Sequence, residues 1–133
     1  MSNADIDFDA YGRAVLAGEV TVCKWTRLAV ERHYRDMDTA ADRCLVFSEP
    51  HARHALQFFD FLRHSKDRWA GQAFQLSPWQ AFWHAVLFGW LRADGTRRFR
   101  KGYMRVARKN GKTTTMAGTG LYLLVGDGIA GAE

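Results

Sequence analysis

Apolar residues recur at helical spacing along the first half of the chain. Residues 8–19 and 22–36 favour helix, although each segment has only a partial apolar stripe. A clearer pattern follows Ser48, which can cap a helix, and Pro50, which suits a first helical turn. The apolar residues of this third segment fall on one helical face: Ala52, Ala55, Leu56, Phe59 and Leu62. The sequence therefore predicts an N-terminal helical region over 1–70. The tripeptide Ser2-Asn3-Ala4 is left out of this predicted fold.

The stretch "LSPWQAFWHAVLFGWLR" predicts a fourth and more apolar helix. Ser77 can cap it, and Pro78 suits its first position. Gln80 lies off the apolar stripe, which leaves its amide free for a polar role. The stripe itself, expected to be buried along its whole length, consists of Trp79, Phe82, Trp83, Val86, Leu87, Trp90 and Leu91.

The last third of the chain predicts a strand, a loop and a helix in that order. The dipeptides of "ADGT" favour a turn, and residues 97–107, "RRFRKGYMRVA", are rich in strand-forming residues. Residues 112–125 then favour helix. Gly118 and Gly120 inside this helix suggest close packing against a neighbouring strand. The short run "CLVF" is compatible with a strand or with irregular extended chain.

Composition narrows the class of protein. A chain of 133 residues with 47% apolar residues can build one core, and no apolar run reaches the length of a membrane span. The acidic start is unlike a signal peptide, so we expect a soluble, cytoplasmic protein. Cys23 and Cys44 lie among apolar residues and are expected to be buried free thiols. His51 and His54 lack a second ligand pair, which makes a zinc site the weaker interpretation.

Positive charge is concentrated in one segment. The net charge of the chain is +5, but residues 92–112 contain nine basic residues and one acidic residue, so that this segment carries +8 and the remainder −3. Such a local excess favours a polyanionic partner, either a nucleotide or a nucleic acid. The basic residues are Arg92, Arg97, Arg98, Arg100, Lys101, Arg105, Arg108, Lys109 and Lys112.

The basic segment ends in part of a phosphate-loop motif. Gly111, Lys112 and Thr113 match the end of G-x-x-x-x-G-K-[ST], but Val106 stands where the first glycine belongs. In that motif the backbone amides cradle phosphates, the lysine reaches the β and γ phosphates, and the hydroxyl holds Mg²⁺. The predicted position between a strand and a helix favours a nucleotide site over an incidental basic turn.

Several of these stretches together resemble a known family. "VARKNGKTT" looks like the deviant Walker A motif of the large terminase subunits of tailed bacteriophages, and Pro78-Trp79-Gln80 resembles their adenine-side motif. The resemblance extends roughly from Trp69 to Glu133. It implies an ATP-driven motor that packages double-stranded viral DNA into a preformed shell, with an ATPase domain followed by a nuclease domain. The small terminase subunit and the portal protein would be its partners in a host bacterium, with no membrane.

The resemblance also implies roles for individual residues. Lys112 would bind the β and γ phosphates, Thr113 would ligate Mg²⁺, and Arg108 would touch the γ-phosphate, so that Arg108 and Lys112 would be catalytic. Gln80 would read the adenine edge. The nucleotide-binding set that we expect is Gln80, Ala107, Arg108, Lys109, Asn110, Gly111, Lys112, Thr113 and Thr114. ATP and Mg²⁺ would be the cofactors of the full-length protein.

One family feature has no counterpart in this sequence. After Thr113 the carboxylates are Asp127 and Glu133, and neither follows an apolar strand as a Walker B acid should. We therefore expect an N-terminal piece of a larger protein that is inactive alone. Residues 71–133 would form the beginning of its ATPase domain. The predicted fold class is mainly α with the start of an α/β P-loop core, consisting of one strand of a truncated sheet, the phosphate loop and a helix.

Two other functions are compatible with the same residues. A small basic helical module could bind DNA phosphates or a partner protein, with the Gly-Lys-Thr sequence incidental. Another P-loop ATPase, such as a helicase, is the third possibility. Salt dependence separates the first from a nucleotide site, because binding to a phosphate backbone weakens steeply with salt.

Overall fold

The computed structural model describes residues 1–64 and 71–128, and these residues are mainly helical. Short helical turns connect several of the longer helices, and two three-residue strands form a small antiparallel sheet. In chain order the elements are η1 (Asn3–Asp5), α1 (Phe8–Ala17), α2 (Lys24–Thr39), η2 (Ala41–Arg43), β1 (Leu45–Phe47), α3 (Glu49–Phe58), η3 (Phe59–Phe61), α4 (Pro78–Gly89), β2 (Trp90–Arg92), α5 (Lys112–Leu121) and η5 (Tyr122–Gly126).

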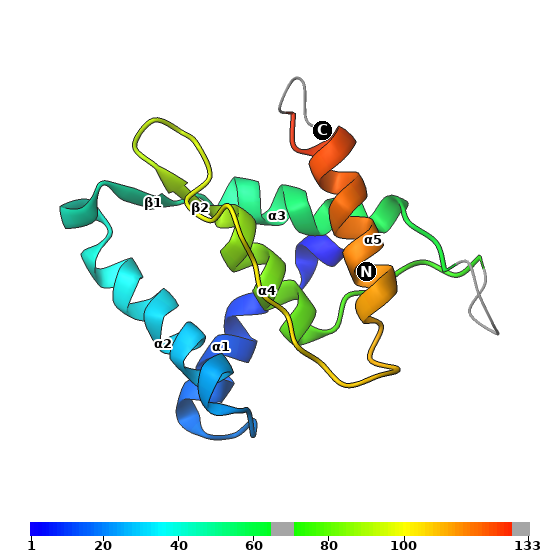
Figure 1. The fold of residues 1–133 in the computed structure, drawn as a ribbon, viewed down its shortest axis with the longest axis horizontal. Coiled ribbons are helices and arrows are strands. Elements are labelled where there is room, and N and C mark those ends of the chain that lie inside the picture. Colours follow the sequence, from blue (N-terminus) through cyan, green and yellow to red (C-terminus); the bar gives the residue numbers. More distant parts are fainter. Residues whose placement is uncertain (65–70, 129–133) are drawn as a thin grey trace.

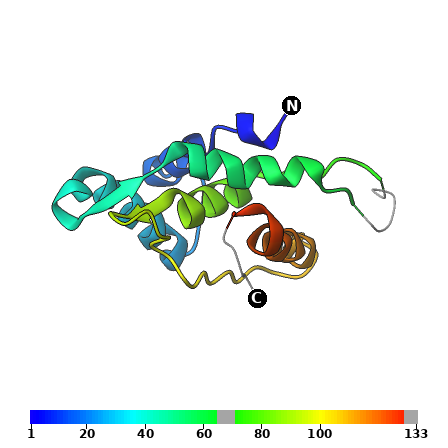
Figure 2. The ribbon, with the colours of Figure 1, turned by 90° about the horizontal axis from the view of Figure 1, so that it is seen from above.

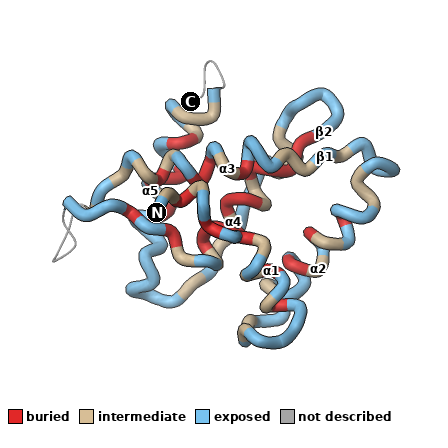
Figure 3. Tube along the Cα trace, turned by 180° about the vertical axis from the view of Figure 1, so that it is seen from behind, coloured by how far each residue is buried: buried red, intermediate tan, exposed pale blue. Residues whose placement is uncertain are grey.

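The helices α3 and α4 pack against each other at the centre of the molecule. Helices α1 and α2 lie on one side of this pair and α5 lies on the other (Figures 1 and 2). Small residues permit the close approach, because Ala52 and Ala55 of α3 and Ala81 and Ala85 of α4 are all completely buried. Buried residues accordingly concentrate along the centre of the trace (Figure 3).

Helices α3 and α4 begin where the sequence predicts, directly after Ser48 and Ser77, although the Ser77 hydroxyl itself makes no capping hydrogen bond. Ser48 accepts a hydrogen bond from the backbone N–H of His51 at 3.4 Å, and a proline stands in the first turn of each helix. At the start of α4, the side-chain oxygen of Gln80 accepts from the backbone N–H of Ser77 at 2.9 Å. These contacts involve residues three apart, so the local sequence suffices to define where both helices begin.

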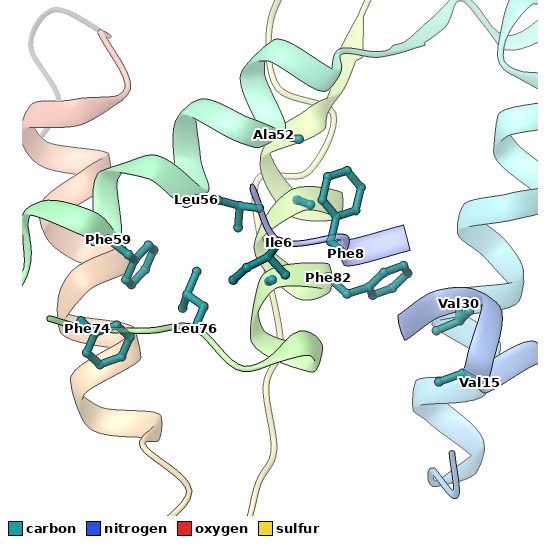
Figure 4. Close-up of a cluster of buried hydrophobic side chains, with 12 residues drawn as sticks. Ile6, Phe8, Val15, Val30, Ala52, Leu56, Phe59, Phe74, Leu76 and Phe82 are labelled. Carbon is teal, nitrogen blue, oxygen red and sulfur yellow. The ribbon is translucent and has the colours of Figure 1, made fainter. Parts of the chain in front are cut away.

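The first residues of the chain belong to the core, although the sequence analysis left Ser2-Asn3-Ala4 out. Ile6 and Phe8 insert between α3 and α4 (Figure 4). Asn3 is 1% exposed. Its amide nitrogen donates to Asp60 Oδ1 at 2.7 Å, and its amide oxygen accepts from the backbone N–H of Leu76 at 2.8 Å. Asn3 therefore connects the N-terminus to the chain on both sides of residues 65–70.

The orientation predicted for α4 is wrong for most of its apolar stripe. Of the seven residues expected to be buried, Phe82, Trp90 and Leu91 are buried, whereas Trp79, Trp83, Val86 and Leu87 are only half-buried. The face packed most closely is the one that contains Ala81, Ala85, His84 and Phe88. Size explains the error, because alanines let α3 approach closely, whereas the large residues face a less covered side. Helix α4 also ends at Gly89, and Trp90 and Leu91 are buried in β2.

The strand predicted at residues 97–107 is absent. Beyond a single bridge between Leu91 and Arg97, this segment runs as irregular chain from β2 to α5, across α4 in Figure 1. Strand-forming residues need a neighbouring strand to pair with, and in the described residues the sheet consists of β1 and β2 alone. The run "CLVF", by contrast, supplies β1, with Leu45 opposite Arg92.

The prediction that both cysteines are buried is wrong, and the two histidines have partners within the fold. Cys23 and Cys44 are both exposed, because Cys23 lies at the N-cap of α2 and Cys44 sits in a left-handed turn after η2. His51 contacts Ser48, and His54 contacts the hydroxyl of Tyr122.

Within residues 1–64 and 71–128, no three His, Cys, Asp or Glu side chains gather as metal ligands. No helix in these ranges is both long and apolar enough to cross a membrane.

Candidate phosphate-loop site

The candidate loop approaches α5 through two residues in left-handed conformation. Lys109 has φ 65° and Gly111 has φ 71°, and the side-chain amide of Asn110 donates to the carbonyl of Ala107 at 3.2 Å. Val106, which replaces the first glycine of the motif, does not have a positive φ. The loop therefore makes its turns closer to α5, and its backbone does not require glycine at residue 106.

The N-terminus of α5 opens directly from this loop. The backbone N–H of Thr115 donates to the carbonyl of Gly111 at 2.9 Å, so the amides of Lys112, Thr113 and Thr114 lie in the first helical turn. Helix geometry leaves such amides without carbonyl partners inside the helix, and the helix dipole adds positive potential there. Residues 107–114 are all exposed. The predicted nucleotide-binding residues are thus contiguous and accessible at a helix N-terminus, with the exception of Gln80.

Gln80 lies beside the loop but is buried, with 6% of its surface exposed. Its oxygen accepts from Ser77, and its nitrogen donates to the hydroxyl of Thr115 at 3.0 Å. A β-carbon built on Gly111 would lie 3.5 Å from that nitrogen. The structure therefore brings Gln80 next to the phosphate loop. Its expected contact with adenine stays a prediction.

His84 extends the contact between α4 and α5 by one turn. Its Nδ1 lies 2.7 Å from the carbonyl oxygen of Gln80, which can only accept, so Nδ1 carries the proton. Its Nε2 lies 2.8 Å from the hydroxyl of Thr119. Burial lowers the pKa of His84 to about 4, so at neutral pH the ring is uncharged. Its Nε2 and the carbonyl oxygen of Thr115, also 2.8 Å away, share the single hydroxyl proton of Thr119.

A buried ion cluster anchors the start of the basic segment. Arg98 pairs with Asp36 of α2 at 2.7 Å, and Arg43 pairs with the same carboxylate at 2.5 Å. Burial alone would raise the pKa of Asp36, but the contact with Arg98 and the charges of the neighbouring arginines outweigh it and lower the pKa. Nearby, Trp90 donates to His33 Nδ1 at 3.0 Å, and burial lowers the pKa of His33 to about 4.

The other basic residues of the segment divide into two groups. Arg97 lies 3.7 Å from Asp127, so together with Arg98 it has an acidic partner within the fold. The remaining seven are exposed, and all but Arg92 of β2 belong to the loop or to the segment that leads into it: Arg92, Arg100, Lys101, Arg105, Arg108, Lys109 and Lys112. The predicted concentration of positive charge is therefore largely available to a ligand.

The described residues provide an incomplete site for Mg²⁺. Thr113 is exposed and can offer one hydroxyl, whereas Mg²⁺ in nucleotide sites also takes phosphate oxygens and one or two carboxylates. Asp127 lies beyond the far end of α5, more than roughly 15 Å along the helix axis from Lys112. Its pairing with Arg97 also directs it elsewhere. Glu133, the other carboxylate after the loop, lies outside the described residues, as does Trp69.

A hollow of about 810 Å³ lies between α2, α4 and the irregular segment. Trp25, Trp79 and Trp83 contribute aromatic surface to it, and Arg32 and Arg105 contribute charge. The half-buried side of α4 faces this hollow, which accounts for the partial exposure of Trp79 and Trp83.

One comparison with known proteins bears directly on this segment. Residues 78–130 match the model of the terminase large subunit, ATPase domain. The match covers 53 of the 133 residues, so this segment is similar to that family. The matched segment begins at α4, includes the candidate loop and α5, and confirms the resemblance drawn from the sequence motifs. No curated protein and no solved structure matches the chain.

Sequence reasoning missed several residues around the matched segment. His84, Thr115 and Thr119 form a buried polar contact, but their types and spacing are also common in ordinary helices. The repeated four-residue interval from Gln80 to His84, matched by Thr115 to Thr119, was the signal available in the sequence. Asp36 gave none, because its partner Arg98 is far away along the chain.

Proposed function

We propose that residues 107–114 bind the phosphates of ATP, and that the chain supplies this part of an ATP-driven DNA-packaging terminase. The observation that carries the proposal is the exposed Gly-Lys-Thr turn at the N-terminus of α5, within the segment that matches the terminase ATPase family. Exposed amides, a helix dipole and several cations together favour a polyphosphate. Double-stranded DNA, the small terminase subunit and the portal protein are its proposed partners by family resemblance.

Each side chain of the loop has a proposed task. Lys112 reaches the β and γ phosphates, Arg108 neutralises charge on the γ-phosphate, and Thr113 ligates Mg²⁺ through its hydroxyl. Gln80 is proposed to contact the base from the adenine side. Bound Mg²⁺ would neutralise charge on the phosphates. Because Thr113 is the one ligand assigned here, we do not expect this chain alone to hydrolyse ATP at an appreciable rate.

Titration with Mg²⁺ and ATP tests the proposal. Lys112→Ala should weaken ATP binding by about tenfold to a hundredfold, since it removes a charge-assisted hydrogen bond worth roughly 1.5 to 3 kcal/mol. Lys101→Ala is the matched control, because Lys101 is an exposed lysine of the same basic segment. It should change the affinity less than threefold at about 0.15 M salt, where distant charges are screened.

The same pair of variants separates nucleotide binding from a general basic surface. If the chain binds DNA phosphates through the whole segment, both lysine variants should lose DNA affinity equally, and binding should fall steeply with salt. Equal losses of ATP affinity in the two variants would favour that alternative and contradict a specific phosphate loop.

A further inference from the structure

Two side-chain hydrogen bonds fix the register of α5 on α4. Gln80 bonds Thr115 at 3.0 Å, and His84 lies 2.8 Å from Thr119. Gln80 and His84 are four residues apart on α4, and Thr115 and Thr119 are four residues apart on α5. The two contacts therefore lie one turn apart on both helices. Sliding α5 along its axis would break both contacts at once.

Burial makes these contacts selective. Thr115 and His84 are completely buried, and Gln80 and Thr119 are each 6% exposed. A buried polar group without a partner carries a large desolvation cost, so alternative positions of α5 are disfavoured. On another side, Gly118 admits the ring of Phe59, since a β-carbon at residue 118 would lie 2.6 Å from that ring. This packing partner is helical rather than the strand expected from the sequence.

The contact between Gln80 and Thr115 lies directly next to the candidate loop. Thr115 donates its backbone N–H to Gly111, whose β-carbon position is 3.5 Å from the amide nitrogen of Gln80. The direction of the first-turn amides, from Lys112 to Thr114, therefore depends on where Thr115 is held.

We propose that Thr115, held by Gln80, is a positioning residue for the phosphate loop. Thr115 is completely buried and so acts on a ligand only through the loop. In this role Gln80 affects the phosphate end of a nucleotide through Thr115, separately from any contact with the base. The inference rests on the proposed function, because it requires phosphates to bind at residues 107–114.

The test compares two ligands and two substitutions at one position. Thr115→Val removes the hydroxyl and keeps the shape, whereas Thr115→Ser keeps the hydroxyl. Affinities for ATP and for inorganic tripolyphosphate, which has no base, are measured with Mg²⁺ by calorimetry. Thr115→Val should weaken both ligands by the same factor, about fivefold, as the loss of one hydrogen bond predicts, and Thr115→Ser should stay within about twofold.

Two controls separate positioning from general loss of stability. Val15→Ala creates a cavity in α1, away from the loop, and should leave both affinities unchanged in the folded protein. If Thr115→Val does not fold, Thr119→Val, one turn farther from the loop, takes its place with a smaller expected loss.

The outcomes are distinct. A loss confined to ATP would overturn the inference and assign the effect to the base. Equal affinities of the valine and serine variants, or an equal loss in Val15→Ala, would also overturn it while leaving the proposed function intact. If the unsubstituted chain binds neither ligand, the proposed function fails and the inference fails with it.

Discussion

Single polar residues with distant partners hold much of this molecule together. Asn3 joins the N-terminus to Asp60 and to the segment before α4, and Asp36 joins α2 to the basic segment through Arg98. Such residues were not identified from the sequence, because polarity alone does not distinguish a buried amide or carboxylate from an exposed one. Their partners become evident only when segments far apart in the chain are brought together.

Replacing Asn3 tests how much one such residue contributes. Asn3→Ala should lower the free energy of unfolding by roughly 2 to 4 kcal/mol, because it leaves the buried N–H of Leu76 and C=O of Phe74 without their partner. Chemical denaturation measures the change. Asn110→Ala removes an exposed amide with one loop contact and should cost less than about 0.5 kcal/mol. Similar losses in both variants would contradict the structural role of Asn3.

At the scale of elements, local signals located the helices but not their orientation. Capping residues and prolines act over three or four positions, so the starts of α3 and α4 could be predicted. The face that α4 buries depends on α3, α1 and α5, and close packing of alanines there outweighed the larger apolar residues. The prediction of a strand at residues 97–107 was wrong for the same reason, since strand formation depends on a neighbouring strand that local sequence does not reveal.

Two aromatic truncations test the observed orientation of α4. Phe88→Ala should cost about 3 to 5 kcal/mol, because Phe88 is 4% exposed and packs against Tyr122. Trp83→Ala should cost clearly less, about 1 to 2 kcal/mol, since its ring is half-buried beside the hollow. Thermal and chemical melts measure both. A larger loss at Trp83 would restore the orientation expected from the sequence.

For the whole molecule, the buried titratable groups predict loss of stability in acid. The pKa values of His33 and His84 are lowered to about 4, so between pH 6.5 and 4 the unfolded chain binds protons that the folded chain does not. Stability therefore falls as pH falls through this window. Asp36 has a lowered pKa as well, and as pH falls below its ordinary range the unfolded chain again takes up the proton first.

Urea denaturation between pH 7 and pH 4 measures this effect. Each histidine should contribute a slope of up to about 1.4 kcal/mol per pH unit inside the window. His33→Gln and His84→Gln should each lower stability at pH 7 and flatten the pH dependence by the share of one histidine. A slope that neither substitution changes would assign the acid sensitivity to other groups.

The hollow beside α4 affects how experiments on this protein are interpreted. Its aromatic lining and basic rim suit anionic aromatic dyes, the reagents commonly used to detect loosely packed states. The folded chain itself is therefore expected to bind such a dye and enhance its fluorescence. Dye fluorescence would then be a poor criterion for misfolding in this protein, and near-ultraviolet circular dichroism would report more directly on whether the packing around Trp90 is intact.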